Sequence, residues 1–149
     1  MGRNIETVED DAGKATTYHR HPNGGGLIGP GARVEEDSFI GATTYVEAGA
    51  HIGSGCRIGR GGWIDRQAVV GDHVFIGDDV YVGRGTTLGN RVHVGSHSRL
   101  GAGARIGHGA RLHGDTILPD GTRVSDAAPS RRASTRRRNV PGPDSRMAA

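Results

Sequence analysis

The sequence contains few of the residues on which several classes of protein depend. Cys56 is the only cysteine among 149 residues, which excludes an intrachain disulfide and a cysteine-rich zinc module. Aromatic residues make up only 4% of the chain. No apolar run approaches the roughly eighteen residues of a transmembrane helix, and the polar N-terminus does not resemble a signal peptide. We therefore expect a cytoplasmic protein without a membrane partner.

Positive charge is concentrated at the C-terminal end of the chain. The formal net charge is +3, and residues 126–149 contain six arginines against two aspartates. This stretch is polar, contains proline and has almost no large apolar residues, a composition typical of disorder. We expect residues 126–149 to form a basic disordered tail. Its arginines should attract nucleic acid only weakly, because no aromatic residues lie among them.

Glycine is abundant, with 27 residues, and most of it belongs to a repeat of six residues. From Ile28 to Val124 an aliphatic residue occupies every sixth position, seventeen times without interruption. We call this position i. Position i+1 is Gly in eleven of the sixteen full hexads and Glu or Asp in three more, and His113 and Pro119 are the exceptions. Such a fixed short period predicts a β-solenoid, in which each unit buries its apolar face by stacking on its neighbours.

The alternation of side chains along a strand predicts where each repeat position points. Residues at i and i+4 should face the interior, residues at i−1 and i+1 should flank i on the outside, and i+2 and i+3 should turn the corner. Glycine at i+1 would free the backbone for the bend. Cys56 stands at i+4, and we expect it to be a small buried core residue.

The repeat resembles that of the hexapeptide-repeat superfamily, whose members are left-handed parallel β-helices with eighteen residues per coil. This resemblance implies an all-β fold with about five and a half coils over residues 28–125. We expect the polar N-terminal segment, residues 1–27, to be flexible and disordered like the tail. One end of the chain is expected to cover the open strand edges of a terminal coil. Family members usually assemble as trimers, so we also expect a homotrimer.

With eighteen residues per coil, residues eighteen apart stack into outward columns. One column contains Tyr45, Trp63 and Tyr81, and a second contains Phe39, Arg57, Phe75, His93 and Arg111. An exposed aromatic ladder indicates a subunit interface, which Tyr45, Trp63 and Tyr81 would form. The alternative is a platform for a ligand such as a sugar ring or a nucleotide base.

Most enzymes with this repeat resemble acyltransferases that use coenzyme A or an acyl carrier, with a histidine base in the groove between two subunits. The resemblance implies acetyl-CoA or another acyl-CoA as co-substrate and a small hydroxyl or amine compound as acceptor. Histidine suits this role because its pKa lies close to neutral pH. The candidate bases are His73, His108 and His113.

Residues 106–117, IGHGARLHGDTI, also resemble the zinc-binding segment of γ-class carbonic anhydrases. His108 and His113 match the two ligands of that segment, and His93, one coil away, is a candidate third ligand for zinc. Three functions therefore stay open: an acyl-CoA-dependent acyltransferase, which the resemblance favours, a non-catalytic structural or binding β-solenoid, and a zinc protein similar to those anhydrases. The unbroken repeat, which has no loop to enclose a substrate, leaves open whether the chain is an enzyme.

Overall fold

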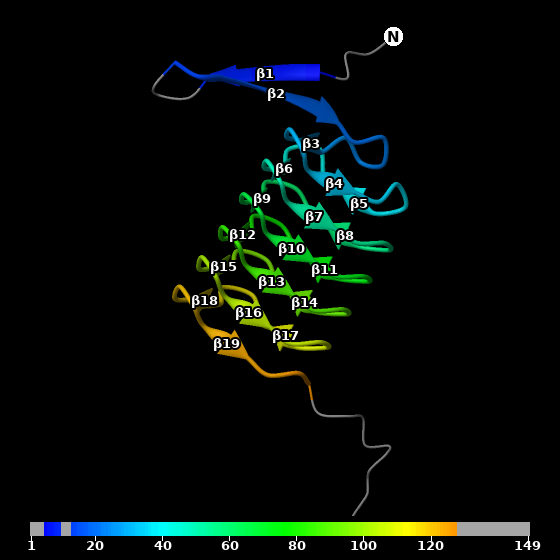
Figure 1. Cartoon of the computed structure of the whole chain (residues 1–149). Coiled ribbons are helices and arrows are strands. Elements are labelled where there is room, and N and C mark those ends of the chain that lie inside the picture. Colours follow the sequence, from blue (N-terminus) through cyan, green and yellow to red (C-terminus); the bar gives the residue numbers. More distant parts are fainter. Residues whose placement is uncertain (1–4, 10–12, 128–149) are drawn as a thin grey trace, which may run out of the picture.

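The computed structural model of the chain describes residues 5–9 and 13–127, which form a β-hairpin followed by a parallel β-helix (Figure 1). The hairpin consists of β1 (Ile5–Glu9) and β2 (Ala15–Arg20), which pair antiparallel. The seventeen strands of the helix have two residues each: β3 (Leu27–Ile28), β4 (Arg33–Val34), β5 (Phe39–Ile40), β6 (Tyr45–Val46), β7 (His51–Ile52), β8 (Arg57–Ile58), β9 (Trp63–Ile64), β10 (Val69–Val70), β11 (Phe75–Ile76), β12 (Tyr81–Val82), β13 (Thr87–Leu88), β14 (His93–Val94), β15 (Arg99–Leu100), β16 (Arg105–Ile106), β17 (Arg111–Leu112), β18 (Ile117–Leu118) and β19 (Arg123–Val124).

The strands form three sheets, which we call the first, second and third faces of the prism. The first face has the order β1-β2-β3-β6-β9-β12-β15-β18, the second β4-β7-β10-β13-β16-β19 and the third β5-β8-β11-β14-β17. Each strand of the helix pairs in parallel with the strand eighteen residues away, as Tyr45 does with Trp63. The all-β fold, the solenoid and the hexapeptide coil predicted from the repeat are therefore confirmed.

The core consists of the side chains at i and i+4, as the repeat predicts. Ile40, Ile58 and Ile64 are fully buried and belong to one continuous cluster along the prism axis. Cys56 is 3% exposed, and its Sγ lies 3.0 Å from the carbonyl oxygen of Gly71. Burial raises the pKa of this thiol. Cys56 is thus the small buried core residue that its repeat position predicts.

Buried hydroxyl groups at position i+4 join successive coils. The Ser38 hydroxyl donates to the Gly53 carbonyl at 2.6 Å and accepts from the Cys56 amide at 2.9 Å. The Thr86 hydroxyl likewise donates to the Gly101 carbonyl oxygen and accepts from the Ala104 amide, and both partners lie in the coil that follows Thr86. Both side chains are completely buried, so these hydrogen bonds satisfy polar atoms that would otherwise be costly in the core.

Glycine at i+1 has a different cause from the bend that the sequence suggests. The left-handed backbone occurs at i+3, for example at Gly103 (φ 68°) and at the non-glycine residue His73 (φ 58°). At i+1 the restriction is close approach, because a Cβ on Gly41 would lie 2.7 Å from the carbonyl carbon of Gly59 in the following coil. At Gly41, stacking of the coils rather than turning of the chain therefore requires glycine. Glu47 and Asp65 show that some i+1 positions do admit a side chain.

The N-terminal hairpin covers the open edge of the first face. β2 pairs antiparallel with β3, and the hairpin lies across that end of the prism (Figure 1). Arg20 forms an ion pair with Glu6 at 2.6 Å, and the buried His21 has its Nε2 2.8 Å from the Ser38 carbonyl oxygen. One end is thus capped as expected. The sequence, however, suggested a flexible N-terminal segment and did not predict this hairpin.

Two further expectations concern the chain ends and the membrane. The predicted disorder of the basic tail falls almost entirely on residues 128–149, which lie outside the described residues. Within the described ranges there is no helix long and apolar enough to cross a bilayer.

Candidate functional site

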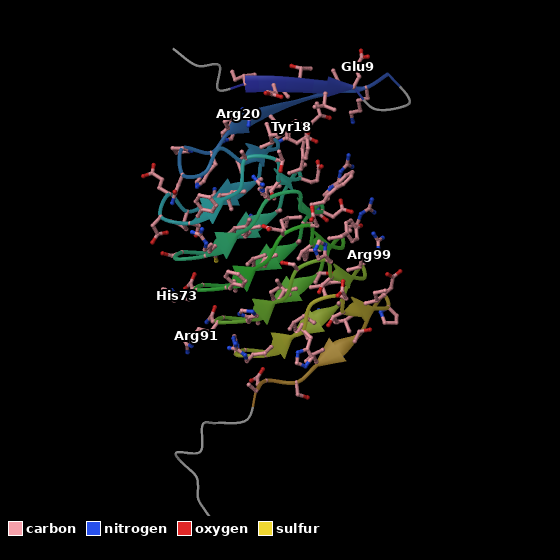
Figure 2. The ribbon with its side chains drawn as sticks, turned by 180° about the vertical axis from the view of Figure 1, so that it is seen from behind. Glu9, Tyr18, Arg20, His73, Arg91 and Arg99 are labelled. Atoms are coloured by element: carbon pink, nitrogen blue, oxygen red, sulfur yellow. The ribbon has the colours of Figure 1, made fainter. Side chains whose placement is uncertain are left out.

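The three candidate bases lie around the third face. His73 and His108 belong to the corner that joins the second face to the third, and His113 directly follows β17 at the far end of the third face. All three side chains are exposed. Figure 2 shows His73 projecting from one edge of the prism, next to Arg91, while Arg99 lies on the opposite side.

His108 is tied into a ladder of hydrogen bonds that runs along its corner. The Asp72 amide donates to Asn90 Oδ1 at 2.9 Å, and the Asn90 amide donates to His108 Nδ1 at 2.8 Å. The His108 amide in turn donates to Asp126 Oδ1 at 2.9 Å. Because Nδ1 accepts a hydrogen bond, a neutral His108 carries its proton on Nε2 and has no free lone pair to accept another. His108 is therefore suited to a structural role better than to that of a base.

His73 offers a more accessible imidazole at the same corner. No hydrogen bond from its ring to the described residues is seen, and the ring lies over Gly55, where a Cβ would meet its Nδ1. Asp37 lies at the same corner, two coils away. The pKa of Asp37 is lowered, first by the hydrogen bond from Ser54 and to a smaller degree by the charge of His73. His73 thus has an exposed imidazole that no hydrogen bond to the described residues occupies.

Aromatic and cationic side chains alternate along the third face next to these histidines. The Arg57 guanidinium lies 4.6 Å from the centre of the Phe39 ring, and the Phe75 and His93 rings stack with centres 4.6 Å apart. Phe39, Arg57, Arg60 and Phe75 line a groove of about 410 Å³. Such a surface can hold a flat ring and a phosphate group together.

His113 can occupy position i+1, where glycine is expected, because no described coil stacks on it. At Gly95, one coil below, a Cβ would collide with the backbone of Gly114, so glycine is required there. The residue that would stack beyond His113 is number 131, which lies outside the described residues. Within the described part of the chain, nothing above His113 restricts its Cβ.

The zinc prediction finds no support within one chain. In the described ranges no group of three or more His, Cys, Asp or Glu side chains is placed to hold a metal ion. The ring of His93 packs on Phe75, and Nδ1 of His108 is occupied by the Asn90 amide. These residues therefore do not fit a zinc site within a single subunit, and the site at His93, His108 and His113 stays a prediction.

The first face carries the aromatic ladder that the columns predict, and the hairpin adds a ring to it. Tyr18 of β2 packs edge-on against Tyr45 with ring centres 5.1 Å apart. Tyr45 and Trp63, and likewise Trp63 and Tyr81, have centres 6.4 Å apart. Trp63 is 50% exposed. The stacking of Tyr45, Trp63 and Tyr81 thus agrees with the sequence, whereas their role as a subunit interface stays a prediction.

A groove of about 780 Å³ lies along this ladder, and we call it the first-face groove. It is lined by the hairpin residues Val8, Thr16 and Tyr18 and by Thr43, Tyr45, Glu47, Gly61, Gly62, Trp63, Asp65, Arg66 and Arg84. The Tyr18 hydroxyl donates to Glu47 Oε1 at 2.8 Å, and the Tyr81 hydroxyl donates to Asp65 Oδ2 at 2.7 Å. Rings and carboxylates are thus interleaved in one depression.

The electrostatics of the groove follow from the burial of Glu47, which is only 8% exposed. Loss of hydration raises the pKa of Glu47, although hydrogen bonds from Tyr18 and Trp63 act in the opposite direction. The pKa of Tyr18 is raised by its own burial and by the bond to Glu47. The pKa of Tyr81 is raised chiefly by the hydrogen bond to Asp65.

Apart from Tyr45 and Trp63, sequence reasoning missed the residues of this groove, among them Tyr18, Glu47 and Asp65. Tyr18 precedes the repeat, so no periodicity could place it. Glu47 and Asp65 did carry a signal, because they occupy i+1 in coils that are followed by further coils, where glycine is otherwise the rule. His113 also departs from glycine at i+1, but it lies in the last described coil, where no further described coil restricts its Cβ.

Comparisons with known proteins place the chain among hexapeptide-repeat proteins. A family model described as the GMPPB C-terminal domain matches residues 23–120. The structure resembles a variant of perosamine N-acetyltransferase from Caulobacter crescentus, solved with CoA and GDP-perosamine, with a TM-score of 0.64 and 30% identity over 68% of this chain and 50% of that one. It also resembles the acetyltransferase domain of PglB from Neisseria gonorrhoeae, solved with acetyl coenzyme A, with a TM-score of 0.64 and 23% identity over 72% of this chain and 53% of that one.

These matches differ in what they cover. No curated protein matches the chain significantly. The chain spans about half the length of the acetyltransferases that it resembles. The similarity to PglB, at 23% identity, shows the fold alone.

Proposed function

The chain belongs to the GMPPB C-terminal domain family, and because the same β-helix occurs in acetyltransferases of known structure, we propose that it transfers an acyl group from acyl-CoA to a small hydroxyl or amine compound. The observation that carries this proposal is the 30% identity to perosamine N-acetyltransferase, solved with CoA and GDP-perosamine. The third face supplies chemistry that suits the reaction.

We assign the role of general base to His73. Its imidazole takes the proton from the acceptor hydroxyl or amine as the acceptor lone pair attacks the thioester carbonyl carbon. The carbon–sulfur bond then breaks, and the imidazolium returns the proton to the departing thiolate, which leaves as the free thiol of CoA. Asp37, two coils away at the same corner, supplies a negative charge that favours the transient imidazolium.

The groove of the third face has features that suit CoA, and from Phe75 it extends toward Gly77 and Asp78, on the side of the face away from His73. Arg57 and Arg60 can pair with its phosphates, and the exposed face of Phe75 can pack on its adenine ring. Because one chain leaves the groove open to solvent on one side, we propose that a homotrimer completes it with a neighbouring subunit.

A second candidate function is a non-catalytic structural or binding solenoid. The observation that favours it is the unbroken repeat from β3 to β19, which leaves no loop to wall in an acceptor. This candidate predicts the same fold and assembly without any turnover.

The test is release of the CoA thiol from acetyl-CoA in the presence of amino sugars and other small amines or alcohols. We expect turnover with at least one acceptor, and we expect His73→Ala to lower kcat about 10²-fold or more, the usual contribution of a general base. His51→Ala, an exposed histidine of the second face, is the matched control and should leave the rate unchanged. Cys56 is the only protein thiol and is buried, so it adds little background to the assay.

The same variants decide between the two candidates. Failure of acetyl-CoA and other CoA esters to raise the melting temperature, together with no turnover, would favour the non-catalytic solenoid. Full activity of His73→Ala with loss of activity in His113→Ala would transfer the role of base to His113.

A further inference from the structure

The first-face groove is the largest depression described above, and the acyl transfer proposed at the third face does not use it. At about 780 Å³ it is nearly twice the size of the groove beside Phe75, at about 410 Å³. The hairpin forms one wall, since Val8, Thr16 and Tyr18 all line it. Figure 2 shows Tyr18 between the hairpin and the first coils. Its volume is typical of a pocket for a small molecule.

The charges around the groove argue against burial under a second copy of the chain. Acidic side chains are depleted in the centre of subunit interfaces, whereas this depression contains Glu47 and Asp65 among its rings. Covering the Asp65 carboxylate with the apolar surface of another subunit would carry a desolvation cost. The mixture of charge and exposed ring is instead what a polar ring-bearing ligand requires.

Arg66 and Arg84 form the positive rim of the groove. They occupy equivalent positions eighteen residues apart, and the Gly85 amide bonds to the Arg66 carbonyl oxygen at 3.0 Å, so the two residues belong to adjacent coils. Both side chains are exposed, and neither forms an ion pair with any residue of the described ranges. The charge of Arg66 also acts on nearby Glu47. Two exposed guanidinium groups in adjacent coils, neither held in an ion pair within the described ranges, are well suited to bind a phosphate group with charge-assisted hydrogen bonds.

The floor of the groove supplies a flat apolar surface beside hydrogen-bond acceptors. Trp63 is half exposed, and its neighbour Tyr45 continues the surface toward the hairpin. Glu47 and Asp65 are held in place by the hydroxyls of Tyr18 and Tyr81. Each carboxylate oxygen can accept more than one hydrogen bond, so both groups retain capacity for donors on a ligand.

We propose that the first-face groove binds a phosphorylated ring compound. Its phosphate contacts Arg66 and Arg84, its ring packs on Trp63, and its hydroxyl or N–H groups donate to Glu47 and Asp65. A nucleoside phosphate and a sugar phosphate both have this chemistry. The site is on a different face from His73, so it stands whether or not the chain is an acyltransferase.

Fluorescence gives a direct test, because Trp63 is the only tryptophan of the chain. The full-length protein is titrated with GDP and with glucose 1-phosphate, and with guanosine, glucose and inorganic phosphate as comparisons, after correction for absorption by the bases. We expect a saturable change in Trp63 emission with at least one phosphorylated probe. Guanosine and glucose should bind at least tenfold more weakly than their phosphorylated counterparts. Calorimetry of the same pairs checks the affinities.

Two arginine variants separate the groove from general attraction by positive charge. Arg66→Ala and Arg84→Ala should each weaken binding about tenfold or more, as expected for loss of a charge-assisted hydrogen bond. Arg33→Ala, an exposed arginine of the second face, should have no effect. All three side chains are exposed and can be changed without disturbing the core.

The outcomes decide between occupants of the groove. Saturable binding of GDP assigns a nucleotide, and binding of glucose 1-phosphate alone assigns a sugar phosphate; both support the proposal. An equal loss in Arg33→Ala, equal affinity for the unphosphorylated probes, or no saturable change would overturn it. So would a Trp63 emission that changes with protein concentration instead of with probe, which would show that another copy of the chain fills the groove.

Discussion

At the scale of single residues, position i+1 shows how stacking restricts the chain. A Cβ added to one of these glycines would point toward the next coil. At Gly41 this Cβ would lie 2.7 Å from both the carbonyl carbon and the carbonyl oxygen of Gly59. Backbone atoms cannot move aside as a flexible side chain can. A side chain at Gly41 must therefore push two coils apart.

We predict that Gly41→Ala destabilises the protein by about 2–3 kcal/mol, the usual cost of overpacking a tight core. The measurement is the shift of the denaturant midpoint, followed by circular dichroism. Gly103→Asn is the control, because Gly103 has φ 68° with open space around it and asparagine tolerates this backbone. It should change stability by no more than about 0.5 kcal/mol. Equal effects of the two substitutions would contradict the close-approach explanation.

At the scale of elements, a buried hydrogen bond between side chains joins the hairpin to the β-helix, in addition to the pairing of β2 with β3. The Tyr18 hydroxyl of β2 bonds to Glu47, which follows β6, and both residues are more than nine-tenths buried. Burial raises the pKa of Glu47 above its usual value of 4.5. Folding therefore favours the neutral form of this carboxyl, which makes its contribution to stability depend on pH.

The sign of this dependence follows from the raised pKa. The contribution of Glu47 is fully present below pH 4.5, its unfolded value, and is lost as the pH rises through the higher folded value. We expect Glu47→Gln to remove this fall in stability above pH 4.5, measured as unfolding free energy against pH. An unchanged pH dependence in Glu47→Gln would contradict the assignment.

Tyr18→Phe provides the companion variant for the same contact. It removes a hydrogen bond that lowers the pKa of Glu47, so the fall in stability should move to higher pH. The variant should also cost about 1–3 kcal/mol, because a buried acceptor loses its donor. Hydrogen exchange should show faster exchange in β1 and β2 than in the parent protein.

At the scale of the whole molecule, the prism offers three faces of different character to a partner. The first face carries the aromatic ladder and its groove, and the third alternates rings with cations. The second face exposes Arg33, His51, Val69, Thr87, Arg105 and Arg123 in one column. Which face lies against a neighbouring subunit decides whether the first-face groove stays open to ligand.

We predict that the protein sediments with the mass of three chains and that Trp63→Ala leaves this mass unchanged, because the ring lies in a ligand groove. Analytical ultracentrifugation over a range of concentrations measures both proteins. Trp63→Phe keeps a ring at the position and serves as the control. Dissociation of Trp63→Ala into single chains would support instead the interface predicted for Tyr45, Trp63 and Tyr81.

The sequence by itself determined the coil of the β-helix. Its signals are local: an aliphatic residue at every sixth position and a small residue four places later. Because every coil has the same pattern, the spacing alone predicts the core, the outward columns and the burial of Cys56. The candidate histidines could be placed on faces in the same way. Their hydrogen bonds could not, since those depend on partners such as Asn90 in another coil.

Only the tertiary structure decided where the hairpin lies and what it encloses. Tyr18 stands outside the repeat, and its bond to Glu47 spans 29 residues that no periodicity connects. The structure also showed that His113 departs from glycine at the end of the described coils, whereas Glu47 and Asp65 depart from it where further coils follow. The physical reason is that a repeat specifies contacts between equivalent positions, while the groove consists of contacts between positions that are not equivalent.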